Sequence, residues 1–289
     1  MLSLSGCAQD RAKPGTIRVL ATTAMVADLV KAVGGDHVEV TTLMGPGIDP
    51  HLFKASPRDV MALKSADVVI ASGLHLEGKL LSALESLQRT DPVLFIGDHL
   101  PEERLLSTDG AHDPHIWFDV ALFAKTLPSI EAQLSKLLPE YATEFKANRL
   151  QKEKSLSDLD DWARTEIGSI PKSRRVLITS HDAFRYFGRA YDIEVRGVQG
   201  LSTESEAGLK EVNKLVELVV NNRISAVFAE TSVSNKNISS LVEGAAAAGH
   251  RVKFGKPLYS DAMGDPGTDA GTYEGMVRAN VNSIVEALR

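Results

Sequence analysis

The sequence predicts an α/β protein of two similar lobes, each a mostly parallel sheet flanked by helices, joined by one long rigid helix. Three observations predict this fold class. Short β-branched runs alternate with helix-length segments through residues 16–138, the alternation returns through 169–289, and residues 139–168 between them have an uninterrupted helical pattern. The predicted division is therefore a lipobox and tether (1–15), an N-terminal lobe (16–138), a linking helix (139–168) and a C-terminal lobe (169–289).

The elements of the N-terminal lobe are set by apolar strand runs and by residues that start or stop helices. Gly34 and Gly35 end the first helix, and Ser56 before Pro57 is a typical N-cap followed by a proline in the first turn. The alternation favours a parallel sheet with helices on its faces. The expected strands are 16–21, 38–43, 67–71 and 93–96, and the expected helices are 25–33, 57–64, 77–87 and 120–138.

The linking helix has clear end signals. Pro139 suits a first helical position, Glu140 complements the positive end of the helix dipole, and Gly168 and Pro171 form a stop signal. Residues 146–154 are mostly charged, so we expect them to be solvated. A long surface helix within a single domain would explain this pattern equally well, but the α/β segments on both sides favour a link. The predicted buried face consists of Ala142, Phe145, Leu156, Leu159, Ala163 and Ile167.

The C-terminal lobe repeats the alternation without a close internal sequence repeat. The expected strands are 175–179, 193–198, 226–229 and 251–254, and the expected helices are 183–190, 208–220, 236–248 and 272–288. The predicted consequence is a second sheet built like the first.

Composition excludes several classes of protein. The chain has 289 residues, of which 43% are hydrophobic, enough for a sizeable core and about two domains. Its 32 basic and 38 acidic residues give a net charge of −6 without a basic run carrying interleaved aromatics, so no nucleic-acid partner is expected. No apolar run approaches the roughly 18 to 20 residues of a membrane-spanning helix.

The N-terminus carries a processing signal. Leu4-Ser5-Gly6-Cys7 matches the lipobox of bacterial lipoproteins, in which the cysteine becomes lipid-modified, and residues 10–15 form a polar tether. Since only six residues precede Cys7, we interpret the start as a truncated signal peptide. The alternative is a lone cysteine in a tail. As the only cysteine, Cys7 also excludes an internal disulfide and a cysteine-rich zinc site.

Four polar residues follow predicted strands, two in each lobe. His51, His115, His181 and Asp261 are expected near the carboxyl ends of strands, where open parallel sheets bind ligands. Three imidazoles and one carboxylate suit Zn²⁺ and are acceptable to Mn²⁺. Spacing alone leaves the alternative open, because the chain has eight histidines, a loop histidine is usually solvated, and no HExxH pair is present.

Other residues near these loops have weaker expectations. Trp117 is expected to wall the cleft and exclude water, and Glu230 to hydrogen-bond a ligating imidazole, although an ordinary strand-end carboxylate fits Glu230 equally well. His75 is expected in packing or in a second layer around the metal. Thr203 and Glu204 lie in a loop that could face a partner, but a solvated acidic loop is the simpler expectation.

Several motifs together resemble a known family. From about Thr16 to the C-terminus the chain resembles the metal-specific solute-binding proteins of bacterial zinc and manganese ABC transporters, the TroA-like (cluster A-I) family. The motifs are Gly47-Ile48-Asp49-Pro50-His51-Leu52-Phe53, Gly73-Leu74-His75-Leu76-Glu77, Asp113-Pro114-His115-Ile116-Trp117, Thr179-Ser180-His181-Asp182-Ala183-Phe184, Ala229-Glu230-Thr231-Ser232-Val233-Ser234, Tyr259-Ser260-Asp261 and Gly271-Thr272-Tyr273.

The resemblance implies a function for the four candidate residues. It implies that His51, His115, His181 and Asp261 bind one Zn²⁺ or Mn²⁺ as cargo, and that the protein is an extracytoplasmic receptor, periplasmic or lipid-anchored. It also implies delivery to an ABC permease driven by an ATPase subunit, without enzymatic activity, and we expect a monomer. His181, where some members carry Glu, is similar to the subgroup that binds zinc, manganese or both.

Two alternatives remain at this point. A zinc-dependent hydrolase could use the same His/His/His/Asp cluster, but it needs an open position for water and a nearby general base, and no motif supplies that base. An adhesin role is compatible with the receptor and is not tested by these residues. The donor set does not choose the metal, although Zn²⁺ should bind more tightly than Mn²⁺ to such a site.

Overall fold

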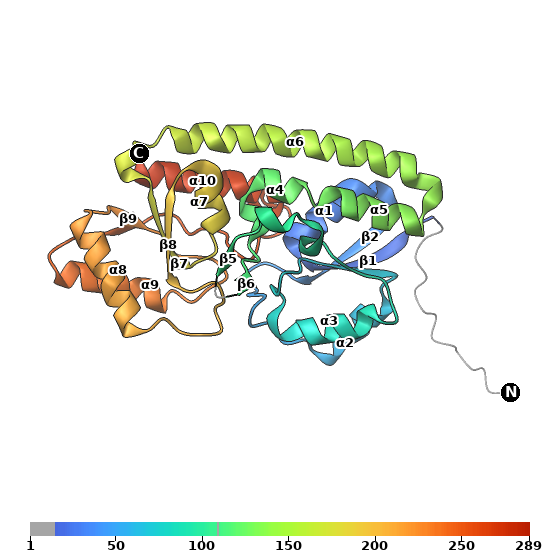
Figure 1. The fold of residues 1–289 in the computed structure, drawn as a ribbon, viewed down its shortest axis with the longest axis horizontal. Helices are drawn as coiled ribbons and strands as arrows, with labels where there is room; N and C mark the ends of the chain where they lie inside the picture. The colour runs from blue at the N-terminus through green and yellow to red at the C-terminus, as the bar shows by residue number, and fades with distance from the viewer. Residues whose placement is uncertain (1–14, 109) are drawn as a thin grey trace.

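The computed structural model describes residues 15–108 and 110–289, so the lipobox Leu4–Cys7 lies outside the described residues. It confirms an α/β fold with parallel sheets flanked by helices and one long helix, α6, that runs over both halves (Figure 1). We call the part with strands β1–β4 the N-terminal lobe and the part with β7–β10 the C-terminal lobe.

The N-terminal lobe is built on a four-stranded parallel sheet in the order β2-β1-β3-β4. Central strand β1 places Val19 between Val40 and Val68. Its side chains alternate: Val19 packs in the core that includes α1 and α6, and Leu20 packs on the other face with α2 and α3 (Figure 1). The strands are β1 Ile17–Thr23, β2 Val38–Met44, β3 Val68–Ala71 and β4 Val93–Phe95, and the helices are α1 Ala24–Gly34, α2 Pro57–Ser65, α3 Leu81–Gln88, α4 Val120–Ala124 and α5 Leu127–Leu137.

The C-terminal lobe repeats this order. Strands β7 and β8 pair in parallel, β9 and β10 do likewise, and parallel bridges from Thr179 to Phe228 and from Glu230 to Leu258 extend the arrangement. The resulting order β8-β7-β9-β10 matches that of the N-terminal sheet. The strands are β7 Val176–His181, β8 Glu194–Gln199, β9 Ala226–Val227 and β10 Lys253–Phe254, and the helices are α7 Arg185–Tyr191, α8 Leu209–Asn221, α9 Lys236–Ala247 and α10 Tyr273–Leu288.

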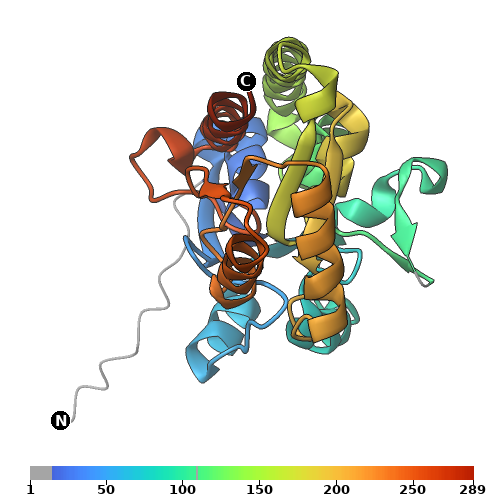
Figure 2. The same ribbon diagram turned by 90° about the vertical axis from the view of Figure 1, so that its left-hand side faces the viewer.

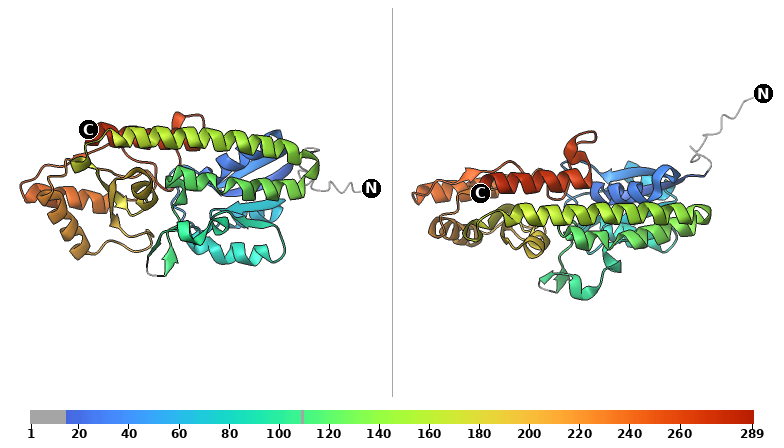
Figure 3. Two further views of the ribbon diagram at one scale, coloured as in Figure 1. Left: turned by 45° about the horizontal axis from the view of Figure 1, so that its top comes forward. Right: turned by 90° about the horizontal axis from the view of Figure 1, so that it is seen from above.

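Helix α6, Ala142–Gly168, has 27 residues and is about 40 Å long. A 3-10 turn, Pro139–Tyr141, precedes it, so the α-helix begins three residues later than the predicted start. It lies beside α10 along the molecule (Figure 3). The predicted face is buried at Phe145, Leu156, Leu159, Ala163 and Ile167, whereas Ala142 is only half-buried.

One hydrophobic core extends through both lobes. It runs from Val19 of β1 through Leu159 of α6 to Leu288 of α10. Phe118 also stacks on Phe184 of the other lobe, with ring centroids 4.1 Å apart. Since such packing has no slack for a wide hinge motion, we expect the lobes to move little relative to each other.

One local expectation is wrong, and another is incomplete. Residues 120–138 form two helices, because Pro128 lacks the N–H that a continuous helix would donate to the Ala124 carbonyl. The charged middle of α6 is not simply solvated, since the half-buried Lys152 ammonium lies 3.1 Å from Asp28 and 3.0 Å from Glu274.

The segment after β4 forms an additional element. It contains a short antiparallel hairpin, β5 Ser107–Thr108 and β6 Ala111–His112, which projects from the body of the molecule (Figure 2). Across the described residues, no helix is both long and apolar enough to cross a membrane.

Candidate metal centre

Two histidines of the N-terminal lobe are placed by the same local structure. His51 follows β2 and His115 follows the hairpin, each as the third residue of an Asp-Pro-His tripeptide. The Asp49 carboxylate accepts the His51 N–H at 2.9 Å, and the Asp113 carboxylate accepts the His115 N–H at 3.0 Å. An aspartate that bonds the backbone two residues on forms a compact turn, and the intervening proline restricts it further. Each turn therefore fixes the backbone from which its imidazole projects.

The C-terminal lobe contributes His181 and Asp261. His181 is the last residue of β7, one step earlier than the expected position just after the strand. Asp261 lies three residues after Leu258, which forms a parallel bridge with Glu230. The backbone N–H of Asp261 lies 3.4 Å from the Ser232 hydroxyl. Both residues therefore lie at the carboxyl ends of the strands, the edge predicted for the ligands.

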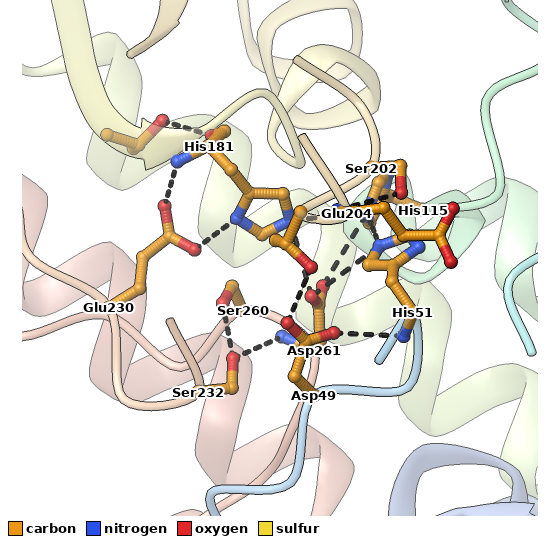
Figure 4. A network of polar contacts seen from close by, with 12 residues as sticks. Asp49, His51, His115, His181, Ser202, Glu204, Glu230, Ser232, Ser260 and Asp261 are labelled. Atoms are coloured by element: carbon orange, nitrogen blue, oxygen red, sulfur yellow. Dashed lines mark hydrogen bonds and ion pairs between the residues drawn. The ribbon is translucent and has the colours of Figure 1, made fainter. Parts of the chain in front are cut away.

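The four donors meet at one point between the lobes (Figure 4). One ligand atom from each of His51, His115, His181 and Asp261 lies within 4.8 Å of the others. The Nε2 atom of His115 is 3.3 Å from that of His51 and 3.4 Å from that of His181. An Asp261 oxygen is 3.3 Å from the His181 Nε2. All four residues are buried, the most accessible being His51 at 4%.

Carboxylates behind two of the rings determine which nitrogen faces the centre. The Nδ1 atom of His115 is 2.8 Å from Asp113, and the Nδ1 atom of His181 is 2.5 Å from Glu230. A carboxylate accepts, so in the neutral form of each ring Nδ1 carries the proton and Nε2 presents a lone pair inward, as a metal ligand requires. Glu230 also accepts the His181 N–H at 2.9 Å. Both rings are thus oriented as metal ligands.

Burial and charge shift the pKa values of the cluster in different directions. Burial lowers the pKa of His51 to about 4, assisted by the neighbouring imidazoles His115 and His181. Burial also disfavours the charge of His181, but the carboxylates of Glu230 and Asp261 outweigh it and hold the pKa of His181 well above its ordinary value. Burial would raise the pKa of Asp261, yet the surrounding histidines lower it. Asp261 is therefore ionised.

The charged oxygens at the centre lack ordinary partners. Within residues 15–108 and 110–289, neither carboxylate oxygen of Asp261 has a hydrogen bond, although both are buried. A buried carboxylate that accepts no hydrogen bond is costly even with imidazole nitrogens 3.3 to 3.7 Å away, and a cation held by the four donors would remove that cost. The cluster therefore has the geometry and the charge of a cation site.

Aromatic side chains close the centre on one side. The Trp117 ring meets that of His115 edge-on at a centroid distance of 5.3 Å, and its Nε1–H donates to the Ser260 carbonyl at 3.0 Å. The Tyr273 hydroxyl donates to the Trp117 carbonyl at 2.6 Å. Trp117 thus packs in the interior beside His115, a candidate ligand.

Two further expectations have different outcomes. Glu230 does hydrogen-bond a candidate ligand, His181. His75 is exposed and lines a cavity of about 370 Å³ together with His51. It lies on the wall of that cavity rather than packed in the interior.

The sequence analysis assigned no role to Asp113, Asp49 or Thr203. The repeated Asp-Pro-His tripeptide was a usable signal for both aspartates. Thr203 lies in the loop expected to be solvated or to face a partner; most of this loop is exposed, but Thr203 itself is only 8% exposed, and its hydroxyl donates to Asp49 at 2.5 Å. That contact joins segments 154 residues apart, so local sequence could not predict it.

This fold and this donor set define a two-lobed metal-binding protein. A family model described as zinc-uptake complex component A, periplasmic (ZnuA), matches residues 19–287. The chain belongs to that family.

Similarity to individual proteins extends over nearly the whole chain. The manganese-binding lipoprotein MntA of Bacillus subtilis is 47% identical, over 99% of this chain and 95% of MntA. The solved periplasmic zinc-binding protein TroA of Treponema pallidum is 41% identical with a TM-score of 0.93, covering 95% of this chain and 99% of TroA. The Fe(III)-bound YtgA of Chlamydia trachomatis is 28% identical with a TM-score of 0.86, covering 94% and 98%.

Replacing Glu230 with Gln is expected to weaken metal binding by about 10- to 100-fold, because the carboxylate that orients and polarises His181 is lost. Competition titration with a chelator measures the change. Glu206→Gln is the matched control: the Glu206 side chain is 70% exposed and forms a long ion pair with Lys236 at 3.6 Å, so the affinity of this variant should match that of the wild type. Equal affinities for both variants would contradict the role of Glu230.

Proposed function

We propose that this chain is an extracytoplasmic receptor that binds one divalent transition metal ion, Zn²⁺ or Mn²⁺, and delivers it to the permease of an ABC transporter. His51, His115, His181 and Asp261 are the proposed ligands. The ion is cargo, and no bond of a substrate is made or broken.

The convergence of four buried donors from both lobes carries this proposal. Two ligands come from each lobe, and the candidate Nε2 and carboxylate atoms lie within 4.8 Å of one another. Three imidazoles and one carboxylate form a complete four-coordinate sphere. A zinc hydrolase would need a position kept open for water, so the closed sphere favours a receptor over the hydrolase alternative.

The proposed surroundings follow from membership of the family. The MntA and TroA proteins to which the chain is similar are described as a lipoprotein and as a periplasmic protein. We propose an extracytoplasmic location with a lipid on Cys7, a permease and an ATPase subunit as partners, and a monomeric receptor. We further propose the lobes 16–138 and 169–289 as its two domains, linked by 139–168.

The chemistry of the donors supports either metal. The relatives are described as binding manganese in MntA and zinc in TroA. With neutral imidazoles, the Asp261 carboxylate leaves one positive charge on a bound divalent ion, and Asp113 and Glu230 lie behind the rings to balance it. Zn²⁺ should bind more tightly in vitro, so the cargo in the cell depends on metal availability.

Elemental analysis tests the proposal. We expect protein purified from a metal-replete bacterial host to contain about one equivalent of metal, and the His181→Ala variant to have lost it because the sphere loses a donor. Circular dichroism of both proteins controls for folding. A folded wild-type protein without metal after incubation with Zn²⁺ and with Mn²⁺ would overturn the proposed function.

A further inference from the structure

A loop of the C-terminal lobe crosses to the N-terminal lobe beside His51. This loop, residues 200–207, follows β8 and is called the crossing loop below. The buried Thr203 hydroxyl donates to the Asp49 carboxylate at 2.5 Å, and Glu204 lies 3.8 Å from Lys79 at the surface. The crossing loop thus makes one buried and one exposed contact with the opposite lobe.

The buried contact continues to a proposed ligand. One Asp49 oxygen accepts from Thr203, and the other accepts the backbone N–H of His51 at 2.9 Å. Asp49 and His51 lie side by side in Figure 4. Asp113 and Glu230 each accept two hydrogen bonds from one histidine, from its backbone N–H and from its Nδ1. Asp49 accepts the backbone N–H of His51 but takes its other hydrogen bond from Thr203 of the crossing loop. The Asp49 carboxylate therefore connects the crossing loop of one lobe to the backbone of His51 in the other.

His51 stands where the centre meets solvent. It is 4% exposed, against 0% for His115 and His181 and 2% for Asp261, and it lines the cavity of about 370 Å³ that the crossing loop also borders. On another side it is backed by Gly78, where an added Cβ would lie 2.7 Å from the His51 carbonyl oxygen. His51 is therefore fixed between Gly78 and the Asp49–Thr203 contact.

We propose that Asp49 and Thr203 are positioning residues that hold His51 in the metal centre and slow dissociation of the metal. The inference rests on the proposed function. Loss of the hydrogen bond from Thr203 frees the loop of His51 from the opposite lobe, and the ligand nearest to solvent can then swing away. A hydrogen bond to a charged group is strong enough for its loss to change a rate by about tenfold or more.

The test measures the rate of metal release. Wild-type protein and variants loaded with Zn²⁺ are mixed with excess chelator in a stopped-flow instrument. Thr203→Val keeps the shape of the side chain but removes its donor, and we expect release to be about tenfold faster, with one equivalent of Zn²⁺ still bound at saturation. Thr203→Ala should behave similarly. Thr203→Ser restores the hydroxyl and should return the rate to within about twofold of the wild type.

Lys79→Met is the matched control, because it removes the other contact of the crossing loop with the N-terminal lobe, the ion pair with Glu204. The side chains of Lys79 and Glu204 are 44% and 47% exposed, so their ion pair is weak and its loss should change the rate by less than about twofold. Equal acceleration by Lys79→Met and Thr203→Val would overturn the inference, because any loosening of the loop would then suffice. Wild-type release rates in Thr203→Val and Thr203→Ala would also overturn it.

The outcomes separate this inference from the proposed function. Wild-type protein that binds no Zn²⁺ would overturn both. Wild-type protein that binds Zn²⁺ stoichiometrically, with unchanged release in the Thr203 variants, would overturn only the positioning role of Asp49 and Thr203.

Discussion

Replacing Asp261 with Asn should lower the affinity for Zn²⁺ or Mn²⁺ by more than about 100-fold, beyond the loss typical of groups behind the ligands. Asp261 is the charged member of the donor set, and its oxygens lie 3.3 Å from His181, 3.5 Å from His115 and 3.7 Å from His51. Asn keeps the size and one carbonyl oxygen, so the change removes the charge and leaves the packing. The attraction lost is large because the site is buried.

Thermal unfolding with and without metal measures this effect. A ligand at 100 times its dissociation constant stabilises the folded state by about 2.7 kcal/mol, so metal should raise the melting temperature of the wild type. At the same metal concentration, we expect almost no rise for Asp261→Asn. Asp265→Asn, an exposed change four residues later, is the control and should behave like the wild type. A full metal-induced rise in Asp261→Asn would remove Asp261 from the ligand set.

The positions of the sheet strands could be predicted from the sequence because each strand is determined by the composition of its own short segment. The apolar runs around Val19, Val69 and Leu177 are buried strand segments whose type follows from β-branched and aliphatic composition. The break at Pro128 was also encoded locally, and the missing N–H there should have divided the predicted helix. That error was one of interpretation.

Contacts between residues far apart in the chain could not be predicted from local sequence. Lys152 has two acidic partners from helices more than 100 residues away, so its environment depends on how α1 and α10 pack on α6. Thr203 is buried by a contact with the other lobe. In both cases a polar residue in a polar segment is expected to be solvated, but long-range packing half-buries Lys152 and buries Thr203.

The predicted site illustrates the same division. The carboxyl ends of parallel strands place His181 and Asp261, and the loops that follow β2 and the hairpin bring His51 and His115 to the same point. The orientation of the rings depends on Asp113 and Glu230. The Asp-Pro-His spacing is a local signal for Asp113, and the position of Glu230 at a strand end is consistent with a bond to an imidazole without identifying which one. Glu230 reaches His181 across 49 residues, a pairing fixed by the neighbouring positions of β7 and β9.

Lowering the pH from about 7.5 to about 5 should weaken metal binding by up to about 300-fold through the proton of one imidazole, because protons compete for the ligands. The carboxylates of Glu230 and Asp261 raise the pKa of His181, which favours the protonated ring in the metal-free protein as the pH falls, and metal must displace that proton. Each pH unit then costs tenfold for that one proton, and 2.5 units cost about 300-fold. His51 adds nothing, since its pKa of about 4 keeps it neutral throughout.

Chelator competition at several pH values, corrected for protonation of the chelator, measures this slope. Calorimetry in buffers of different ionisation enthalpy should show release of at least one proton per Zn²⁺ at about pH 7. Glu230→Gln removes the charge that holds the pKa of His181 high, so its binding should depend less on pH while being weaker at pH 7.5. A wild-type affinity that stays constant between pH 7.5 and pH 5 would remove His181 from the ligand set, because metal binding would then displace no proton from its ring.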